Sequence, residues 1–249
     1  MSSARGREAL GLPGTVVVAA DPDALAAAAA DWVLATTAAA IAARGAVDIA
    51  LSGGSTPAAM YRLLAASPRR EQAEWRRWNV WFGDERACPP DDERSNFHLA
   101  QSLLLRHVPV DPLAVHRMEA ERPDLATAAA EYSALLERLP PDGPGGAPRL
   151  DVILLGLGGD GHTASLFPGE PALDIADTWA TTSRATYEPY DRITLAFPTL
   201  NAGAAVAFLV SGEGKREALR GVVEGTVPAA RIRPVDGQLL WLLDEAAAG

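Results

Sequence analysis

The sequence Leu150-Asp-Val-Ile-Leu-Leu-Gly-Leu-Gly-Gly-Asp-Gly-His-Thr-Ala-Ser-Leu-Phe-Pro168 joins a short apolar run to a glycine-rich turn. The apolar part, 152–155, is too short for a buried helix and is typical of a strand covered on both faces of a parallel sheet. Glycines let the backbone turn sharply and approach a ligand closely. The turn carries Asp160 and His162, so the sequence predicts an acid and an imidazole at the carboxyl end of a central strand, where open α/β sheets form their ligand crevice.

Two other interpretations of this turn stay open. Gly156-x-Gly158-x-x-Gly161 matches the dinucleotide-binding fingerprint and follows a predicted strand. That match is poor in detail, because Asp160 stands where a pyrophosphate would meet amides and Pro168 leaves little room for a helix. A tight turn with a purely structural role is the other interpretation.

Composition sets broad limits on the protein. The 249 residues are 48% hydrophobic and 22% charged, as in ordinary globular proteins. The net charge of −10 argues against a nucleic-acid partner, but cations gathered in a pocket can still bind an anionic substrate. The single cysteine, Cys88, excludes an intrachain disulfide and favours a reducing compartment.

We expect no signal peptide in the amino-terminal region. Residues 1–14 lack the apolar core of a signal peptide, so we expect a flexible segment there and one domain over residues 15–249. The alanine-rich run 24–43 contains Asp31 and is too weakly apolar to insert readily, so it predicts a soluble helix. We therefore expect a cytoplasmic protein with no membrane partner.

Strand and helix patterns alternate along the chain. The predicted strands are 15–20, 47–51, 79–82, 152–155, 178–183, 192–197, 205–210 and 238–242. The predicted helices are 22–44, 57–66, 95–106, 125–139 and 215–223. We interpret the Pro- and Gly-rich run 140–148 as a surface loop rather than a domain linker, because the same alternation continues across it. The pattern predicts an α/β fold: a single doubly wound, mostly parallel, Rossmann-like sheet with helices on both faces.

An anion cradle is the first candidate site outside the central turn. Ser52-Gly53-Gly54-Ser55-Thr56 offers three hydroxyls and free amides at the start of a predicted helix, and helix amino ends bind anions. Pro57 suits a first helical turn. Because the segment lacks the Gly-Lys-Ser/Thr of a nucleotide-binding loop, it favours a single phosphate monoester over a nucleoside triphosphate. An ordinary capped turn remains the alternative.

Charged residues follow other strands. In Gly83-Asp84-Glu85-Arg86, Arg86 could stabilise an oxyanion, and Asp84 could orient Arg86 or a ligand hydroxyl. A solvated loop is the alternative. Lys215, after the predicted strand 205–210, could form the cationic half of an anion site with Arg192. We interpret Cys88 as a small hydrophobic residue rather than a nucleophile.

The pattern of histidines and cysteine predicts no metal site. His98, His107 and His116 show no ligand spacing, and the sequence has no cysteine pair and no serine nucleophile elbow. The functional groups that remain as candidates are a general-base histidine, an acid, an arginine and a phosphate cradle. They suit hydrolysis or isomerisation of a phosphorylated sugar.

Several motifs together resemble one family. These are Ser52-Gly-Gly-Ser-Thr-Pro57, Trp81-Phe-Gly-Asp-Glu-Arg86 with Ser95-Asn96, Gly156-Leu-Gly-Gly-Asp-Gly-His-Thr-Ala-Ser-Leu-Phe-Pro-Gly169, Arg192-Ile-Thr-Leu, Gly212-Glu-Gly-Lys215 and Trp241-Leu-Leu-Asp244. In this order they are similar to the 6-phosphogluconolactonases, whose fold is of the NagB type shared with glucosamine-6-phosphate deaminases. The segment Ala164-Ser-Leu-Phe-Pro168 resembles the lactonase version. Two positions depart from the family: Cys88 replaces an aliphatic residue, and no lysine precedes Pro189.

The resemblance implies hydrolysis of 6-phospho-D-glucono-1,5-lactone in the oxidative pentose phosphate pathway, without a cofactor. It implies that His162 is the general base, that Asp160 holds the imidazole or the substrate, and that Arg86 stabilises the oxyanion. It places the phosphate on one segment and two cations: Gly53, Gly54, Ser55, Thr56, Arg192 and Lys215. We expect a monomer whose only partner is the small-molecule substrate.

Two alternatives stay open. A deaminase or isomerase acting on an amino-sugar phosphate would share the Ser-Gly-Gly and Asp-Gly-His motifs. A sugar-phosphate-binding regulator without catalysis is the other, although Asp160, His162 and Arg86 are all present.

Overall fold

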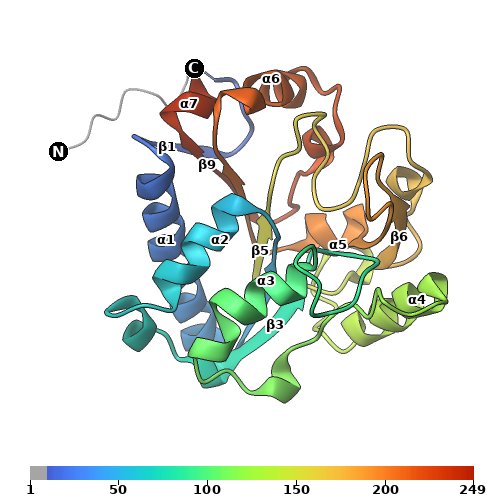
Figure 1. The fold of residues 1–249 in the computed structure, drawn as a ribbon, viewed down its shortest axis with the longest axis horizontal. Helices are drawn as coiled ribbons and strands as arrows, with labels where there is room; N and C mark the ends of the chain where they lie inside the picture. The colour runs from blue at the N-terminus through green and yellow to red at the C-terminus, as the bar shows by residue number, and fades with distance from the viewer. Residues whose placement is uncertain (1–9) are drawn as a thin grey trace.

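The computed structural model describes residues 10–249, which form an α/β fold around a six-stranded parallel sheet (Figure 1). Most of the expected flexible segment, 1–14, lies outside the described residues. Among its described residues, Leu10 and Leu12 pack against the core. The strands are β1 Thr15–Ala19, β2 Val47–Leu51, β3 Trp78–Phe82, β4 Asp84–Arg86, β5 Val152–Leu155, β6 Ala180–Arg184, β7 Asp191–Leu195, β8 Ala205–Val210 and β9 Gln238–Asp244. The helices are α1 Pro22–Arg44, α2 Ser55–Leu64, α3 Asn96–Leu103, α4 Leu125–Leu136, α5 Phe197–Ala202, α6 Arg216–Glu224 and α7 Glu245–Ala248.

Helices cover both faces of the six-stranded sheet, because alternate residues of each strand point to opposite sides. On one face, Leu154 of β5 lies in a core with residues of α1, α2 and α3. On the other face, Ile153 and Leu155 lie in a core with residues of α4, α5 and α6. The predicted doubly wound architecture is confirmed.

Helix α1 is the only helix within residues 10–249 that is long and apolar enough to cross a membrane, with a mean hydropathy of 1.6 in its most apolar window. Its Leu25, Val33 and Ile41 are buried in the core beside α2. In this structure α1 is therefore a core helix.

A second, antiparallel sheet corrects the prediction that all strands belong to a single sheet. It has the order β4-β7-β6, so the strands predicted at 178–183 and 192–197 leave the main sheet. The acid- and arginine-containing segment Asp84–Arg86, expected as a loop, is its third strand. Phe197, expected in a strand, begins α5.

The strand order opens a crevice next to β5. The main sheet runs β1-β9-β8-β5-β2-β3, so the chain moves outward in one direction after β2 and in the other after β5. β2 and β5 pair at only two positions, Ile49 with Val152 and Ala50 with Ile153. Beyond them the carboxyl ends are unpaired, as at a topological switch point. The loop 140–148 precedes β5 and lies at the opposite edge of the sheet.

Two buried tyrosines hold the backbone at this edge. The Tyr61 hydroxyl of α2 accepts from the Ser52 amide at 3.1 Å and donates to the Ser52 carbonyl at 2.6 Å. From the other face, the Tyr132 hydroxyl of α4 accepts from the Phe82 amide at 3.0 Å. Each phenol thus satisfies backbone groups just where a strand ends, which buried backbone requires.

Replacing Tyr61 with phenylalanine should destabilise the protein, because the buried amide and carbonyl of Ser52 lose their partner. We expect the free energy of unfolding to fall by about 1–3 kcal/mol. Urea denaturation would measure this, with Tyr190→Phe, an exposed tyrosine, as the control. Equal stability of the two variants would contradict the anchoring role.

Candidate active site

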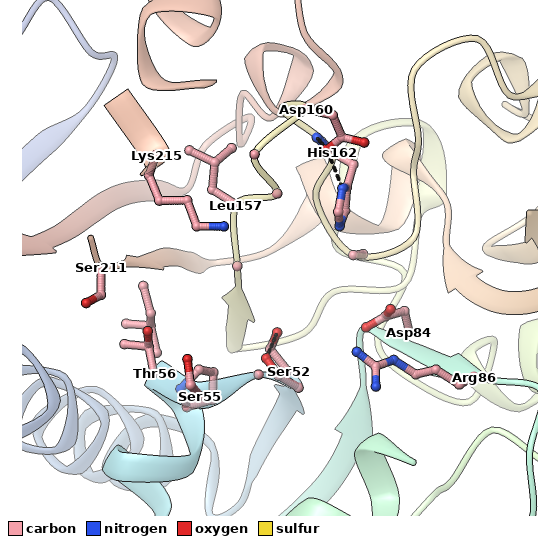
Figure 2. A pocket seen from close by; sticks show the side chains of 18 of the residues that line it. Ser52, Ser55, Thr56, Asp84, Arg86, Leu157, Asp160, His162, Ser211 and Lys215 are labelled. Carbon is pink, nitrogen blue, oxygen red and sulfur yellow. Dashed lines mark hydrogen bonds and ion pairs between the residues drawn. The ribbon is translucent and has the colours of Figure 1, made fainter. Parts of the chain in front are cut away.

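A cavity of about 460 Å³ lies at the carboxyl edge of the main sheet, in the crevice between β2 and β5. Figure 2 shows the side chains that point into it from several elements. They come from the β2–α2 turn, β4, the loop after β5, the β6–β7 hairpin and the segment after β8: Ser52, Gly53, Gly54, Ser55, Thr56, Pro57, Asp84, Arg86, Gly156, Leu157, Gly158, Gly159, Asp160, His162, Ala164, Tyr187, Leu209, Ser211 and Lys215. The turns predicted separately from the sequence therefore meet in one place.

The β2–α2 turn presents a helix amino end to this cavity. Helix α2 begins at Ser55, and its N-cap is Gly54, which has φ +106° and no side chain to bond the first amides. Ser55 and Thr56 face the cavity, and Lys215 reaches in from the other side (Figure 2). Uncapped amides, hydroxyls and an ammonium group together suit a phosphate.

The side chain of Asn96 lies close against the backbone of Gly53. A Cβ atom on Gly53 would lie 1.8 Å from Asn96 Oδ1, so only glycine fits here. Asn96, the first residue of α3, donates through Nδ2 to the Asp84 carboxylate at 3.0 Å and to the Asp84 carbonyl at 2.9 Å. Asn96 therefore joins the anion cradle to β4.

Asp84 is buried and held by neutral donors. Its second carboxylate oxygen accepts from Ser165 Oγ at 2.6 Å. Within residues 10–249 no ion pair joins it to Arg86, so its orienting of Arg86 stays a prediction. Asp84 lines the cavity and remains placed to meet a ligand hydroxyl.

Glu85 and its partners are site residues that the sequence analysis did not identify. The buried carboxylate accepts from the amides of Arg86, Asn96 and Phe97 and from Ser95 Oγ, at 2.7–2.9 Å. Burial raises the pKa of Glu85, although these hydrogen bonds act in the opposite direction. Glu85 thus binds the amino end of α3 to β4. The sequence signal that could have indicated this contact is an acidic residue followed, after a polar loop, by Ser95-Asn96.

Arg86 enters the cavity from β4 with free donors. One terminal nitrogen donates to the Arg94 carbonyl, and its Nε is buried without a hydrogen-bond partner. Arg86 Nη2 has no hydrogen bond within the described residues and is the donor left for a ligand oxygen. The neighbouring Cys88 is buried, and burial raises the pKa of its thiol to about 11, as expected of a small hydrophobic residue rather than a nucleophile.

The loop after β5 holds His162 in one orientation. Its Nδ1 lies 2.5 Å from Asp160 Oδ1, and its ring packs on Phe167 with centroids 4.3 Å apart. A Cβ atom on Gly158 would lie 2.1 Å from Nδ1, so the ring occupies space that only glycine leaves. With Nδ1 bonded to Asp160, Nε2 is left to face the cavity.

Asp160 keeps its charge beside this imidazole. Burial raises the pKa of its carboxyl, but the backbone amide, charge and ring of His162 outweigh burial and bring the pKa below its ordinary value. No helix follows the glycine-rich loop between Gly161 and Gly169. The dinucleotide interpretation of Gly156-x-Gly158-x-x-Gly161 is therefore wrong, since that motif must open a helix.

Arg192 does not line the cavity. Its side chain is buried on β7, opposite Arg86 in the register, with the Tyr187 ring 5.4 Å from the guanidinium. Burial, followed by the like charge of Arg86, lowers the pKa of Arg192. The two predicted phosphate-site cations thus differ in position: Lys215 lines the cavity, whereas Arg192 is buried on the strand next to Arg86.

Asp244 at the end of β9 fixes the segment that carries Lys215. Its carboxylate accepts from Ser211 Oγ at 2.5 Å, from the Gly212 amide at 3.0 Å and from the Ala247 amide at 2.8 Å. Burial raises the pKa of Asp244, but these hydrogen bonds outweigh it, so the pKa lies below its usual value.

Among residues 10–249 no three histidine, cysteine, aspartate or glutamate side chains group as metal ligands would.

The Asp244→Asn variant should lose stability at neutral pH, by about 1–3 kcal/mol, because an amide cannot accept all of these bonds. A carboxyl group with a depressed folded pKa stabilises the protein above its unfolded pKa of about 3.9, and this contribution disappears as pH falls through the folded value. The difference between wild type and variant should therefore shrink below about pH 4. Denaturant titrations across pH would measure it, with exposed Asp177→Asn as control; a pH-independent difference would contradict the assignment.

Comparisons with known proteins agree with this geometry. Residues 20–241 match the family model of glucosamine-6-phosphate isomerases/6-phosphogluconolactonase. A 6-phosphogluconolactonase from Nostoc is 39% identical over 94% of this chain and 96% of its own, and one from Streptomyces coelicolor is 37% identical over 94% and 93%. The solved 6-phosphogluconolactonase of Trypanosoma brucei superposes with a TM-score of 0.85 at 30% identity, covering 95% of this chain and 98% of its own. The chain belongs to the glucosamine-6-phosphate isomerase/6-phosphogluconolactonase family.

Proposed function

We propose that this protein is a 6-phosphogluconolactonase, which hydrolyses 6-phospho-D-glucono-1,5-lactone to 6-phospho-D-gluconate in the oxidative pentose phosphate pathway. The observation that carries the proposal is that the Asp160–His162 pair, Arg86 and the amino end of α2 line the same cavity. A base, an oxyanion donor and a phosphate cradle are what this reaction needs. The names of the relatives at 37–39% identity support the same activity.

In the proposed mechanism His162 acts through Nε2. Asp160 accepts a hydrogen bond from Nδ1–H, which leaves Nε2 to take a proton from water as that water attacks the lactone carbonyl. Arg86 stabilises the negative charge that develops on the carbonyl oxygen. The ring C–O bond then breaks, and the imidazolium returns the proton to the departing ring oxygen. No covalent intermediate is required.

The phosphate is proposed to bind at the opposite end of the cavity. Ser55, Thr56 and the amides that open α2 would hold its oxygens, with Ser52, Gly53 and Gly54 shaping the turn. Lys215 supplies the opposite charge. Arg192 would add positive potential from its place beside Arg86 on the neighbouring strand.

We further propose that the enzyme works as a cytoplasmic monomer. A single buried cysteine suits a reducing compartment. Size-exclusion chromatography with light scattering would measure the oligomeric state.

The direct test is hydrolysis of freshly generated 6-phosphogluconolactone, measured as acid release above the uncatalysed rate. Unphosphorylated gluconolactone is the control substrate, and turnover of it should be far slower. Release of ammonia from glucosamine 6-phosphate would instead indicate a deaminase. Binding of the phosphorylated lactone without turnover would indicate a regulator.

Replacing His162 with alanine should lower kcat by roughly a hundred- to ten-thousandfold, the usual contribution of a general base. The variant His107→Ala, which changes an exposed histidine outside the cavity, should keep full activity. Near-wild-type turnover by His162→Ala would remove His162 from the mechanism and leave the family assignment unchanged.

The variant Gly158→Ala should also lose most of its turnover, by about a hundredfold or more, because its methyl group displaces the His162 ring. Gly159→Ala is a matched control, since a Cβ atom there has no neighbour closer than 4.0 Å. Steady-state kinetics would compare them, with circular dichroism to check that both fold. Equal kcat values would show that the ring position does not depend on Gly158.

A further inference from the structure

Apart from the imidazole of His162, Tyr187 carries the only aromatic ring among the described residues that line the cavity. It lies between β6 and β7, in the turn of the small sheet, and its side chain is 49% exposed. An aromatic ring with one free face inside a ligand cavity is a common contact surface for a ligand. The mechanism above gives this side chain no role.

Neighbours on two sides hold the ring at one end of the cavity. The Arg192 guanidinium lies 5.4 Å from the Tyr187 ring, and Phe167 meets it edge-on with centroids 6.1 Å apart. Phe167 also packs on His162, and Arg192 is the register partner of Arg86. Tyr187 is therefore at the end of the cavity where His162 and Arg86 would act on the lactone, away from the phosphate cradle.

We propose that Tyr187 packs its ring against the lactone ring and thereby sets the affinity of the site for the cyclic substrate. This inference rests on the proposed lactonase function. A pyranose-type ring exposes C–H groups on its faces, and the flat apolar side of a phenol complements them. The contact exists before and during the reaction, so it contributes to substrate binding rather than to the chemical step.

Tyr190 provides an internal comparison. It belongs to the same turn and is 42% exposed, and it also has an arginine beside its ring, Arg184 at 5.5 Å. Unlike Tyr187, it does not line the cavity. Removing the Tyr190 ring therefore changes the turn without changing the cavity lining.

The experiment compares Tyr187→Ala, Tyr187→Phe and Tyr190→Ala with wild type in lactone hydrolysis. Tyr187→Ala should raise KM for the phosphorylated lactone about tenfold, on the scale of one aromatic contact, with kcat within about twofold. Tyr187→Phe keeps the ring and Tyr190→Ala leaves the cavity unchanged, so both should resemble wild type. Inhibition by 6-phospho-D-gluconate, which carries the phosphate without a ring, should be nearly the same for Tyr187→Ala and wild type.

Three outcomes would overturn the inference: an unchanged KM in Tyr187→Ala, an equal rise of KM in Tyr190→Ala, or an equal weakening of inhibition by the open-chain product. The last two would mean a general effect on the turn or on phosphate binding. A wild-type enzyme without lactonase activity would be a different result, because it would overturn the proposed function itself.

Discussion

The reversal of strand order between β2 and β5 is the constraint on which the rest of the site depends. After β2 the chain turns to one face of the sheet and forms α2, whereas after β5 it turns to the other face, where Leu157 and Leu166 enter the core. Because the two connections leave in opposite directions, neither covers the gap between them. Backbone amides and short polar side chains can therefore approach a ligand from both sides, as in other doubly wound folds.

The cations around this gap keep their charge available for a ligand. Asp84, Glu85 and Asp244 are buried, and each accepts hydrogen bonds from neutral hydroxyl or amide donors. Within residues 10–249 no ion pair includes Arg86, Arg192 or Lys215. The formal charges of the cavity lining balance, with Arg86 and Lys215 against Asp84 and Asp160, so a protein with a net charge of −10 presents a cavity without a net negative charge to an anionic substrate.

Sequence patterns predicted the main sheet, the family and the turns that meet at the cavity. Long apolar runs and glycine-rich turns carry this information because they depend on local geometry and burial. The second sheet was missed: β4 is three polar and charged residues long, so its pairing with β7 has no periodic signal of its own. Strand pairing between distant segments is decided by tertiary packing rather than by local preference.

The detailed roles at the site also needed coordinates. The sequence shows that residue 158 is glycine, but only the structure shows that its missing side chain leaves room for the His162 ring. Likewise Arg192 was expected beside the phosphate, and only the fold shows that it is buried next to Arg86 on the neighbouring strand. Such facts depend on contacts between segments, which spacing along the chain does not encode.

The buried thiol described beside β4 has a practical consequence. Cys88 is the only cysteine in the sequence, and with a pKa of about 11 it carries almost no thiolate at neutral pH. Thiolate is the species that reacts with alkylating dyes. A cysteine introduced on the exposed surface would therefore accept a fluorophore selectively, without first removing a native thiol. A cysteine introduced into the exposed β6–β7 turn could therefore be labelled for single-site spectroscopy with the rest of the sequence unchanged.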